Sequence, residues 1–240
     1  MNRFVPLPEP SHTDTQAEEW RRLSWSGGVS TGSFRSTAPC PSVMEMSRRF
    51  DAAGLGGVLG PSVFVGAWLV GGSRLAGYSM VDDAISRLAA VDASTRLLMS
   101  VGFVGFSVGV GTFSVSLGKR GFRKAGISAA IASMATLGFA AQPLNHSSMV
   151  DRLHGMAATV GYVSLAVTPL LASGPLRWKG FERSSKVSLL ISLISAASLA
   201  ATVAGPAHGL FQRLGLTASD LWLVAAGVAC GRGVLDGPIR

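Results

Sequence analysis

Residues 97–117 read LLMSVGFVGFSVGVGTFSVSL, and this stretch decides the fold class. It contains no charged side chain, and its length matches the roughly 20 mainly apolar residues that a helix needs to cross the hydrocarbon core of a bilayer. It is too long for a strand, and it lacks the alternation of polar and apolar residues that a membrane barrel requires. The stretch therefore predicts a transmembrane helix.

Five further apolar segments of similar length surround the first. They cover residues 53–72, 125–144, 153–173, 187–204 and 218–235. Only 14% of the 240 residues are charged, against about 25% in soluble globular domains. We therefore predict an all-α, polytopic transmembrane bundle of about six helices, formed by residues 51–240.

Residues 1–50 have a different composition. They are polar and rich in Gly, Ser, Thr and Pro, so they cannot bury enough apolar surface to offset the entropy lost on ordering. We predict a disordered N-terminal tail. Alternatively, translation starts at Met44 or Met46, and the upstream residues are not part of the protein.

The connections between the apolar segments alternate in charge. Four basic residues lie in each of the connections 118–124 and 174–186, whereas Arg152 and Arg213 are the only ones between segments three and four and between five and six. Because basic residues are retained in the cytoplasm, this pattern predicts six helices with both termini cytoplasmic. The expected location is the plasma (inner) membrane, with the lipid bilayer as the surroundings.

Segment two also carries a small-xxx-small pair, Gly105 and Gly109. Such a pair admits a close neighbouring helix, because in lipid the packing of helices depends on close backbone approach. The alternative is that the pair only reflects the general abundance of glycine, of which the chain has 30.

The predicted topology gathers polar residues on the extracytoplasmic side. Three of the four histidines fall there, together with Asp82, Asp83 and Asp151. The candidate ligand-binding residues of this cluster are Tyr78, Ser79, His146 and His208. His154 would lie about one turn inside the membrane segment, where ionisable groups are costly and often mark functional sites.

Asp151 and His154 are three residues apart at the start of segment four, so they share a helix face. The carboxylate could orient the imidazole as a general base. Alternatively, Ser148-x-x-Asp151 is a capping box, with the acid placed favourably near the helix N-terminus.

Ser79-x-x-Asp82 likewise predicts the cap of a short interfacial helix, with Val81, Ile85 and Leu88 as its apolar stripe. Asp83 would lie in the first turn of that helix. Ser86 would lie one turn after Asp82, where it could face the same cavity. Asp83 and Ser86 are therefore further catalytic candidates beside His154 and Asp151.

Other classes of site lack support in the sequence. There is no HExxH or CxxC pattern, no phosphate-binding loop, and no nucleophile elbow in a credible context. The basic residues flank apolar segments and do not form a stripe with aromatic residues, as nucleic-acid binding requires. We predict no metal, no cofactor and no nucleic acid.

Three short stretches resemble a bacterial and archaeal membrane family, domain of unknown function 998. They are AGYS (76–79) followed by DAISRL (83–88), His154-Gly155 at the start of a membrane helix, and GLFQR (209–213) leading into Leu221-Trp222. The resemblance covers residues 53–235, implies a similar helix count, and places Tyr78, Ser79, Asp83, Ser86 and His154 on the family's pattern. It implies no reaction. The Ser, Asp and His residues on one membrane face also resemble the ceramidase-like transmembrane hydrolases, but this chain lacks their late histidine pair.

The sequence favours an accessory membrane protein that binds a lipid ligand or a partner membrane protein. One alternative is a membrane-embedded lipid hydrolase that uses His154 with Asp151 or Asp83. A small transporter is the other, although the sequence shows no clear inverted repeat.

Overall fold

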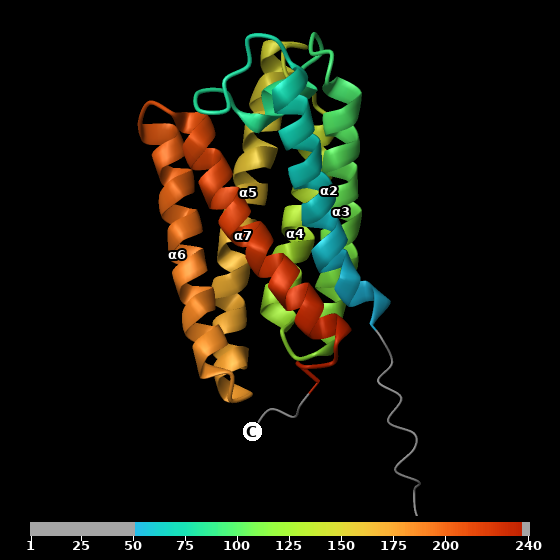
Figure 1. Cartoon of the computed structure of the whole chain (residues 1–240), viewed down its shortest axis with the longest axis vertical. Helices are drawn as coiled ribbons and strands as arrows, with labels where there is room; N and C mark the ends of the chain where they lie inside the picture. The colour runs from blue at the N-terminus through green and yellow to red at the C-terminus, as the bar shows by residue number, and fades with distance from the viewer. Residues whose placement is uncertain (1–50, 237–240) are drawn as a thin grey trace, which may run out of the picture. The chain divides into compact units, whose positions relative to one another are not determined.

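The computed structural model describes residues 51–236, and every long element in this range is a helix (Figure 1). The helices are α2 (Ala52–Arg74), α3 (Arg96–Lys119), α4 (Arg123–Ala140), α5 (Ser148–Trp178), α6 (Glu182–Ala204) and α7 (His208–Gly231), with a 3₁₀ turn η1 (Ile85–Ala89) between α2 and α3. The predicted all-α bundle of six helices is confirmed. The predicted tail, residues 1–50, lies outside the described residues.

Five of the described helices are long and apolar enough to cross a membrane: α2, α3, α5, α6 and α7. The sixth, α4, has 18 residues, begins with Arg123 and Lys124, and packs against α3 and α5. At 1.5 Å per residue it extends about 27 Å, close to the thickness of the hydrocarbon core. A bilayer is therefore the environment that this bundle fits.

Helix α7 closes the bundle. It runs between α6 and α2 and also touches α5, so the last helix packs beside the first described one (Figure 1). A Cβ atom on Gly54, at the start of α2, would lie 2.9 Å from the backbone nitrogen of Gly231, at the end of α7. The described chain therefore begins and ends at the same end of the bundle.

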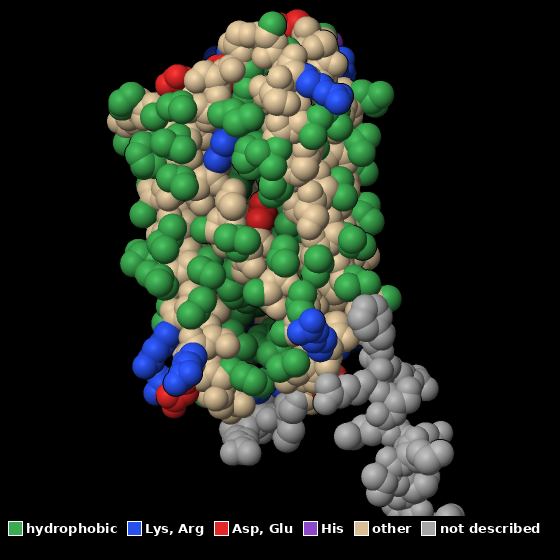
Figure 2. All heavy atoms as spheres, in the orientation of Figure 1, with side chains coloured by type: hydrophobic (Ala, Val, Ile, Leu, Met, Phe, Trp, Pro, Cys, Tyr) green, Lys and Arg blue, Asp and Glu red, His purple; other side chains and the backbone are tan. Residues whose placement is uncertain are grey.

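The two ends of the bundle differ in chemistry. We call the end with the connections 120–122 and 179–181 the basic end, and the end with the connections 75–95, 141–147 and 205–207 the histidine end. Hydrophobic side chains cover much of the face in Figure 2, and most of its Lys and Arg side chains gather near the two ends. Leu193 and Val203 are among the apolar side chains on the exposed surface of α6.

Several of the predicted segment boundaries are wrong. The third segment ends at Ala140 rather than 144, and the fourth begins at Ser148 and continues to Trp178 rather than covering 153–173. The largest error concerns the last segment, predicted from 218, because α7 begins at His208. Residues 208–213 form its first turns, and the side chains of Gln212 and Arg213 find partners in the bundle, so Arg213 lies in a helix and not in a loop.

The small-xxx-small pair of α3 faces α2. A Cβ atom on Gly109 would lie 2.6 Å from the Cα atom of Gly60, and one on Gly105 would lie 2.7 Å from Val63 Cγ1. The helices touch backbone to backbone at Gly109, where only glycine fits. The prediction of a close neighbour is confirmed.

Hydroxyl groups form the buried face of α6. Its buried residues are Ser185, Ser188, Ser192 and Ser195, at a spacing of three and four residues. Ser192 Oγ donates to the Ala166 carbonyl on α5, and Ser195 Oγ donates to the Gly215 carbonyl on α7, each at 2.7 Å. We call these four residues the serine seam.

Candidate functional site

Arg213, two turns into α7, is the centre of the histidine end. Only 6% of the residue is exposed, and its Nη1 atom donates to the carbonyl oxygens of Met80 (2.7 Å), Asp83 (3.0 Å) and Gly209 (2.8 Å). Its Nη2 atom donates to the Tyr78 hydroxyl, and the guanidinium lies over the rings of Trp68 and Tyr78. No described carboxylate forms an ion pair with it. Arg213 therefore fastens the connection 75–95 to α7 through neutral groups.

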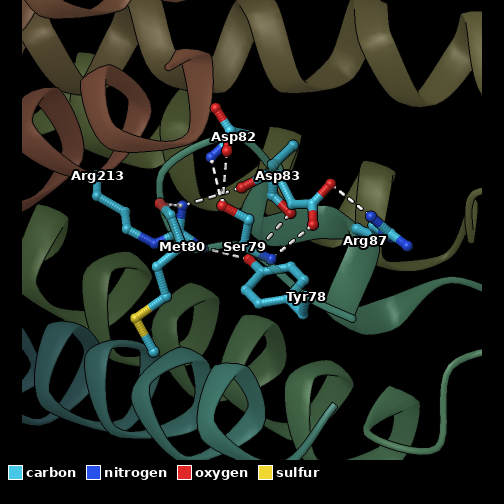
Figure 3. Close-up of polar contacts among 8 residues, drawn as sticks. Tyr78, Ser79, Met80, Asp82, Asp83, Arg87 and Arg213 are labelled. Carbon is cyan, nitrogen blue, oxygen red and sulfur yellow. Dashed lines mark hydrogen bonds and ion pairs between the residues drawn. The ribbon is translucent and has the colours of Figure 1, made fainter. Parts of the chain in front are cut away.

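Tyr78 contacts the guanidinium group of Arg213 through its hydroxyl group (Figure 3). Its hydroxyl accepts from Arg213 and donates to the Ala84 carbonyl at 3.2 Å. Burial raises the pKa of Tyr78, an effect that Arg213 partly opposes. Both hydrogen-bonding directions of this hydroxyl are used within the protein.

Ser79, Asp82 and Asp83 form a tight turn beside Arg213 (Figure 3). The Asp82 amide donates to Ser79 Oγ (3.1 Å), which donates to the Asp82 carboxylate (2.8 Å). The Ser79 amide donates to Asp83 Oδ2 (2.8 Å), and Arg87 pairs with Asp83 Oδ1 (2.5 Å). The Ser79 amide, followed by Arg87 and His208, lowers the pKa of Asp83.

The predicted interfacial helix over this segment is wrong. The Ser79–Asp82 hydrogen bonds of a cap are present, but the chain turns instead of continuing as a helix, and η1 begins only at Ile85. Val81 is exposed while Ile85 and Leu88 are buried. The turn is favoured because the Asp83 and Met80 carbonyls serve Arg213, and the Val81 carbonyl accepts from the Leu210 amide in the first turn of α7.

Gln212 extends the network into the bundle. Its Oε1 atom accepts from the Ile85 amide and its Nε2 atom donates to the Tyr162 hydroxyl on α5, each at 2.8 Å. Sequence reasoning assigned no role to Gln212 or Tyr162. The available signal was the polar pair Gln212-Arg213 next to an apolar run, because such groups in a membrane helix need internal partners.

His154 is buried away from this network. Its Nδ1 atom lies 2.7 Å from the Gln142 carbonyl, and its ring packs against Phe139 with centroids 5.4 Å apart. Among the described residues, no hydrogen bond joins His154 to the other predicted catalytic residues, which are Asp151, Asp83 and Ser86. His154 therefore ties the start of α5 to the start of the connection that follows α4.

Asp151 and the remaining histidines lie apart from His154. The predicted cap at Ser148 is wrong by one residue, because Ser147 Oγ accepts from the Val150 amide, while Asp151 accepts from the Asn145 amide. His146 and His208 are exposed. No three His, Cys, Asp or Glu side chains within residues 51–236 gather as metal ligands would.

The basic end has its own central arginine, Arg120, which is partly buried. It pairs with Asp51 (2.5 Å) and Asp236 (2.7 Å), and its Nη2 atom donates to the Cys230 carbonyl at 3.2 Å. Burial opposes ionisation of Asp51, but hydrogen bonds from Ser116 and Arg120 lower its pKa below the ordinary value. Arg120 thus joins the end of α3 to the start of α2 and the end of α7.

An apolar cavity of about 310 Å³ lies at the basic end between α5, α6 and α7. Its walls include Leu176, Ser188, Trp222 and Ala226, and Arg183 stands in the first turn of α6. The Trp222 Nε1 atom donates to Ser188 Oγ at 2.8 Å, so the polar atoms of this pair are satisfied within the wall. Arg183 takes part in none of the ion pairs among the described residues. No prediction from sequence placed a site here.

Comparison with known proteins agrees with this architecture. The family model described as "Protein of unknown function (DUF998)" matches residues 58–229, which include Tyr78, His154 and nearly all of α7. No curated protein and no solved structure matches the chain. This match, together with the six-helix bundle, shows that the chain belongs to the DUF998 family of membrane proteins of unknown function.

Proposed function

We propose that the protein is a lipid-binding accessory membrane protein, and that the cavity at the basic end holds an acyl chain of an anionic lipid. The observation that carries this proposal is the apolar volume of about 310 Å³ with the unpaired Arg183 beside it. Ligand pockets in proteins measure about 300–1,000 Å³ and are mostly apolar, with a few polar groups that fix orientation. Within a bilayer, lipid molecules surround the protein and are therefore available as ligands.

The position of Arg183 suits a lipid headgroup. It is exposed in the first turn of α6, where the helix would enter the bilayer, while Ile191 and Ala226 line the cavity farther along their helices. Basic side chains at this depth attract anionic lipids, each with about 1 kcal/mol near a charged surface. The predicted topology places this end in the cytoplasmic leaflet, where anionic lipids are enriched.

The histidine end is a weaker candidate for lipid binding. The Tyr78 hydroxyl and the Ser79 side chain are already engaged within the protein. A ligand there would have to replace these bonds, whereas the cavity at the basic end needs no rearrangement. We therefore assign binding to the basic end.

The test uses the full-length protein in detergent, with native mass spectrometry to count bound phosphatidylglycerol or phosphatidylcholine. Ala226→Phe fills the cavity and should weaken phosphatidylglycerol binding at least tenfold, or about 1.4 kcal/mol. Ala197→Phe, at an exposed position on α6, is the matched control and should bind as the wild type does.

A second pair of variants tests the headgroup contact. Arg183→Gln should reduce the preference for phosphatidylglycerol over phosphatidylcholine severalfold, whereas Arg177→Gln removes the same charge outside the cavity and should not. Unchanged binding by Ala226→Phe would contradict the proposal. Equal effects of the two arginine variants would mean that the lipid preference comes from general surface charge and not from a contact with Arg183.

A further inference from the structure

Asp220 is a buried carboxyl group without a partner in the middle of α7. The residue is 3% exposed, and neither of its side-chain oxygens has a hydrogen-bond partner. It is the thirteenth of the 24 residues of α7, so about 18 Å of helix separates it from the first residue at 1.5 Å per residue. In a bilayer this position is close to the midplane.

The face of α7 that carries Asp220 is packed. Leu216 and Leu223, one turn to either side, are buried, and a Cβ atom on Gly57 of α2 would lie 2.9 Å from the Leu223 carbonyl. Ser219, the neighbour in sequence, turns to α6, where its hydroxyl bonds to Ser195. The carboxyl group of Asp220 therefore receives no hydrogen bond from these serine hydroxyls.

Charged and titratable groups on the surrounding elements lie near the ends of the bundle or are already hydrogen-bonded. They are Arg74 on α2, Arg87 on η1, Arg96 and Lys119 on α3, Asp151, Arg152, His154, Tyr162 and Arg177 on α5, Glu182, Arg183 and Lys186 on α6, and His208, Arg213 and Cys230 on α7 itself. Arg213 is seven residues before Asp220, about 10 Å along the axis, and its Nη atoms bond to Tyr78 and three carbonyls. None of the described ion pairs involves Asp220.

We propose that Asp220 is a proton-binding site near the membrane midplane, protonated while α7 is packed against α2 and able to release the proton when this interface admits water. An isolated ionised carboxylate in apolar surroundings is so unfavourable that the group takes up a proton instead. A proton is also the cation that one carboxyl group can hold unaided, since Ca²⁺ or Mg²⁺ requires about six oxygen ligands.

The consequence for function is a coupling between protonation and the position of α7. Carboxyl groups inside the membrane are typical of proton relays. Leu221 and Trp222 line the lipid cavity, but Asp220 is not among its lining residues. The proton site therefore does not depend on the proposed lipid function, and either can fail alone.

Infrared spectroscopy of the full-length protein in detergent tests the protonation directly. At pH 7 the wild type should show the carbonyl band of a protonated carboxylic acid, and ¹³C-labelled aspartate should shift it. Asp220→Asn should abolish this band, whereas Asp83→Asn and Asp51→Asn should keep it, because both of those carboxylates are paired with arginine. Absence of the band in the wild type, or its persistence in Asp220→Asn, would overturn the proposal.

The pH dependence of thermal unfolding provides a second measurement. The folded chain holds a proton that the unfolded chain, with an ordinary aspartate near pKa 3.9, has released above about pH 5. The melting temperature of the wild type should therefore fall relative to that of Asp220→Asn as the pH rises from about 5 to about 8. Asp220→Glu should keep a protonated band that labelled aspartate no longer shifts. A constant difference between wild type and Asp220→Asn over this range would contradict the proposal.

Discussion

The two ends of the bundle each use one arginine, buried at the histidine end and partly buried at the basic end, but in opposite ways. At the histidine end, Arg213 binds carbonyl oxygens and a phenol, whereas at the basic end Arg120 binds the carboxylates of Asp51 and Asp236. Arg213 organises a connection of 21 residues between α2 and α3, and Arg120 joins helix ends that are already adjacent. A charged side chain such as Arg213 is thus needed most in the connection 75–95, which has little regular structure of its own.

The two ends also differ in how completely the space between the helices is filled. At the histidine end the connection 75–95 lies against the start of α7, and the Leu210 amide donates to the Val81 carbonyl. At the basic end the connections are short, and an apolar cavity remains between three helices. Polar groups therefore close one end, while the other retains room for a ligand.

The largest expected effect on stability comes from removing Arg213, the arginine that has neutral partners. Arg213→Met would leave the Met80 and Asp83 carbonyls without this donor, and bonds to a charged group contribute about 1.5–3 kcal/mol each. We expect a loss of about 3 kcal/mol of unfolding free energy, measured by thermal unfolding in detergent. Arg87→Met removes an exposed arginine from the same end and should cost less than about 1 kcal/mol. Equal losses would mean that burial of Arg213 is unimportant.

At the basic end, Asp51→Asn should have a smaller effect, about 1–2 kcal/mol, because Asp236 still pairs with Arg120. The lowered pKa of Asp51 fixes the sign of the pH dependence. Its stabilisation is present above the ordinary value, near pH 4, and is lost as the pH falls through the lower pKa of the folded state. The stability difference between wild type and variant should therefore shrink in acid. A difference that grows in acid would contradict the assignment.

The smallest expected effect is confined to the turn beside Arg213. Asp83→Asn weakens the bonds to the Ser79 amide and to Arg87, and should cost about 0.5–1 kcal/mol. Hydrogen–deuterium exchange should become faster in residues 79–84 and stay unchanged in α7. Asp92→Asn, which affects a bond to Asn145 in the same end, is the control and should leave residues 79–84 as they are.

The helices could be predicted from sequence because each apolar run comes close to the length needed to cross a bilayer. The start of α7 could not, since Gln212, Arg213 and Asp220 all argue against a membrane segment when read locally. The partners of Arg213 in residues 78–83 are at least 130 positions away along the chain. Only the folded bundle brings them together.

The candidate site was predicted in part. The sequence indicated that Tyr78, Ser79 and Asp83 belong together, and the structure joins them through Arg213 and the turn. It could not indicate that His154 bonds to the Gln142 carbonyl, because a histidine at a helix start has many possible partners. The cavity was also beyond prediction, since its walls combine side chains from four helices, one connection and the segment that follows α7.

The serine seam has a consequence for how the bundle responds to its surroundings. Hydroxyl-to-carbonyl bonds such as Ser192 to Ala166 act over a short range. In the apolar interior of a membrane these hydroxyls meet no water, so their bonds to α5 and α7 have no competitor. A thinner or more hydrated bilayer, by offering water to these hydroxyls, should weaken the attachment of α6 to its neighbours.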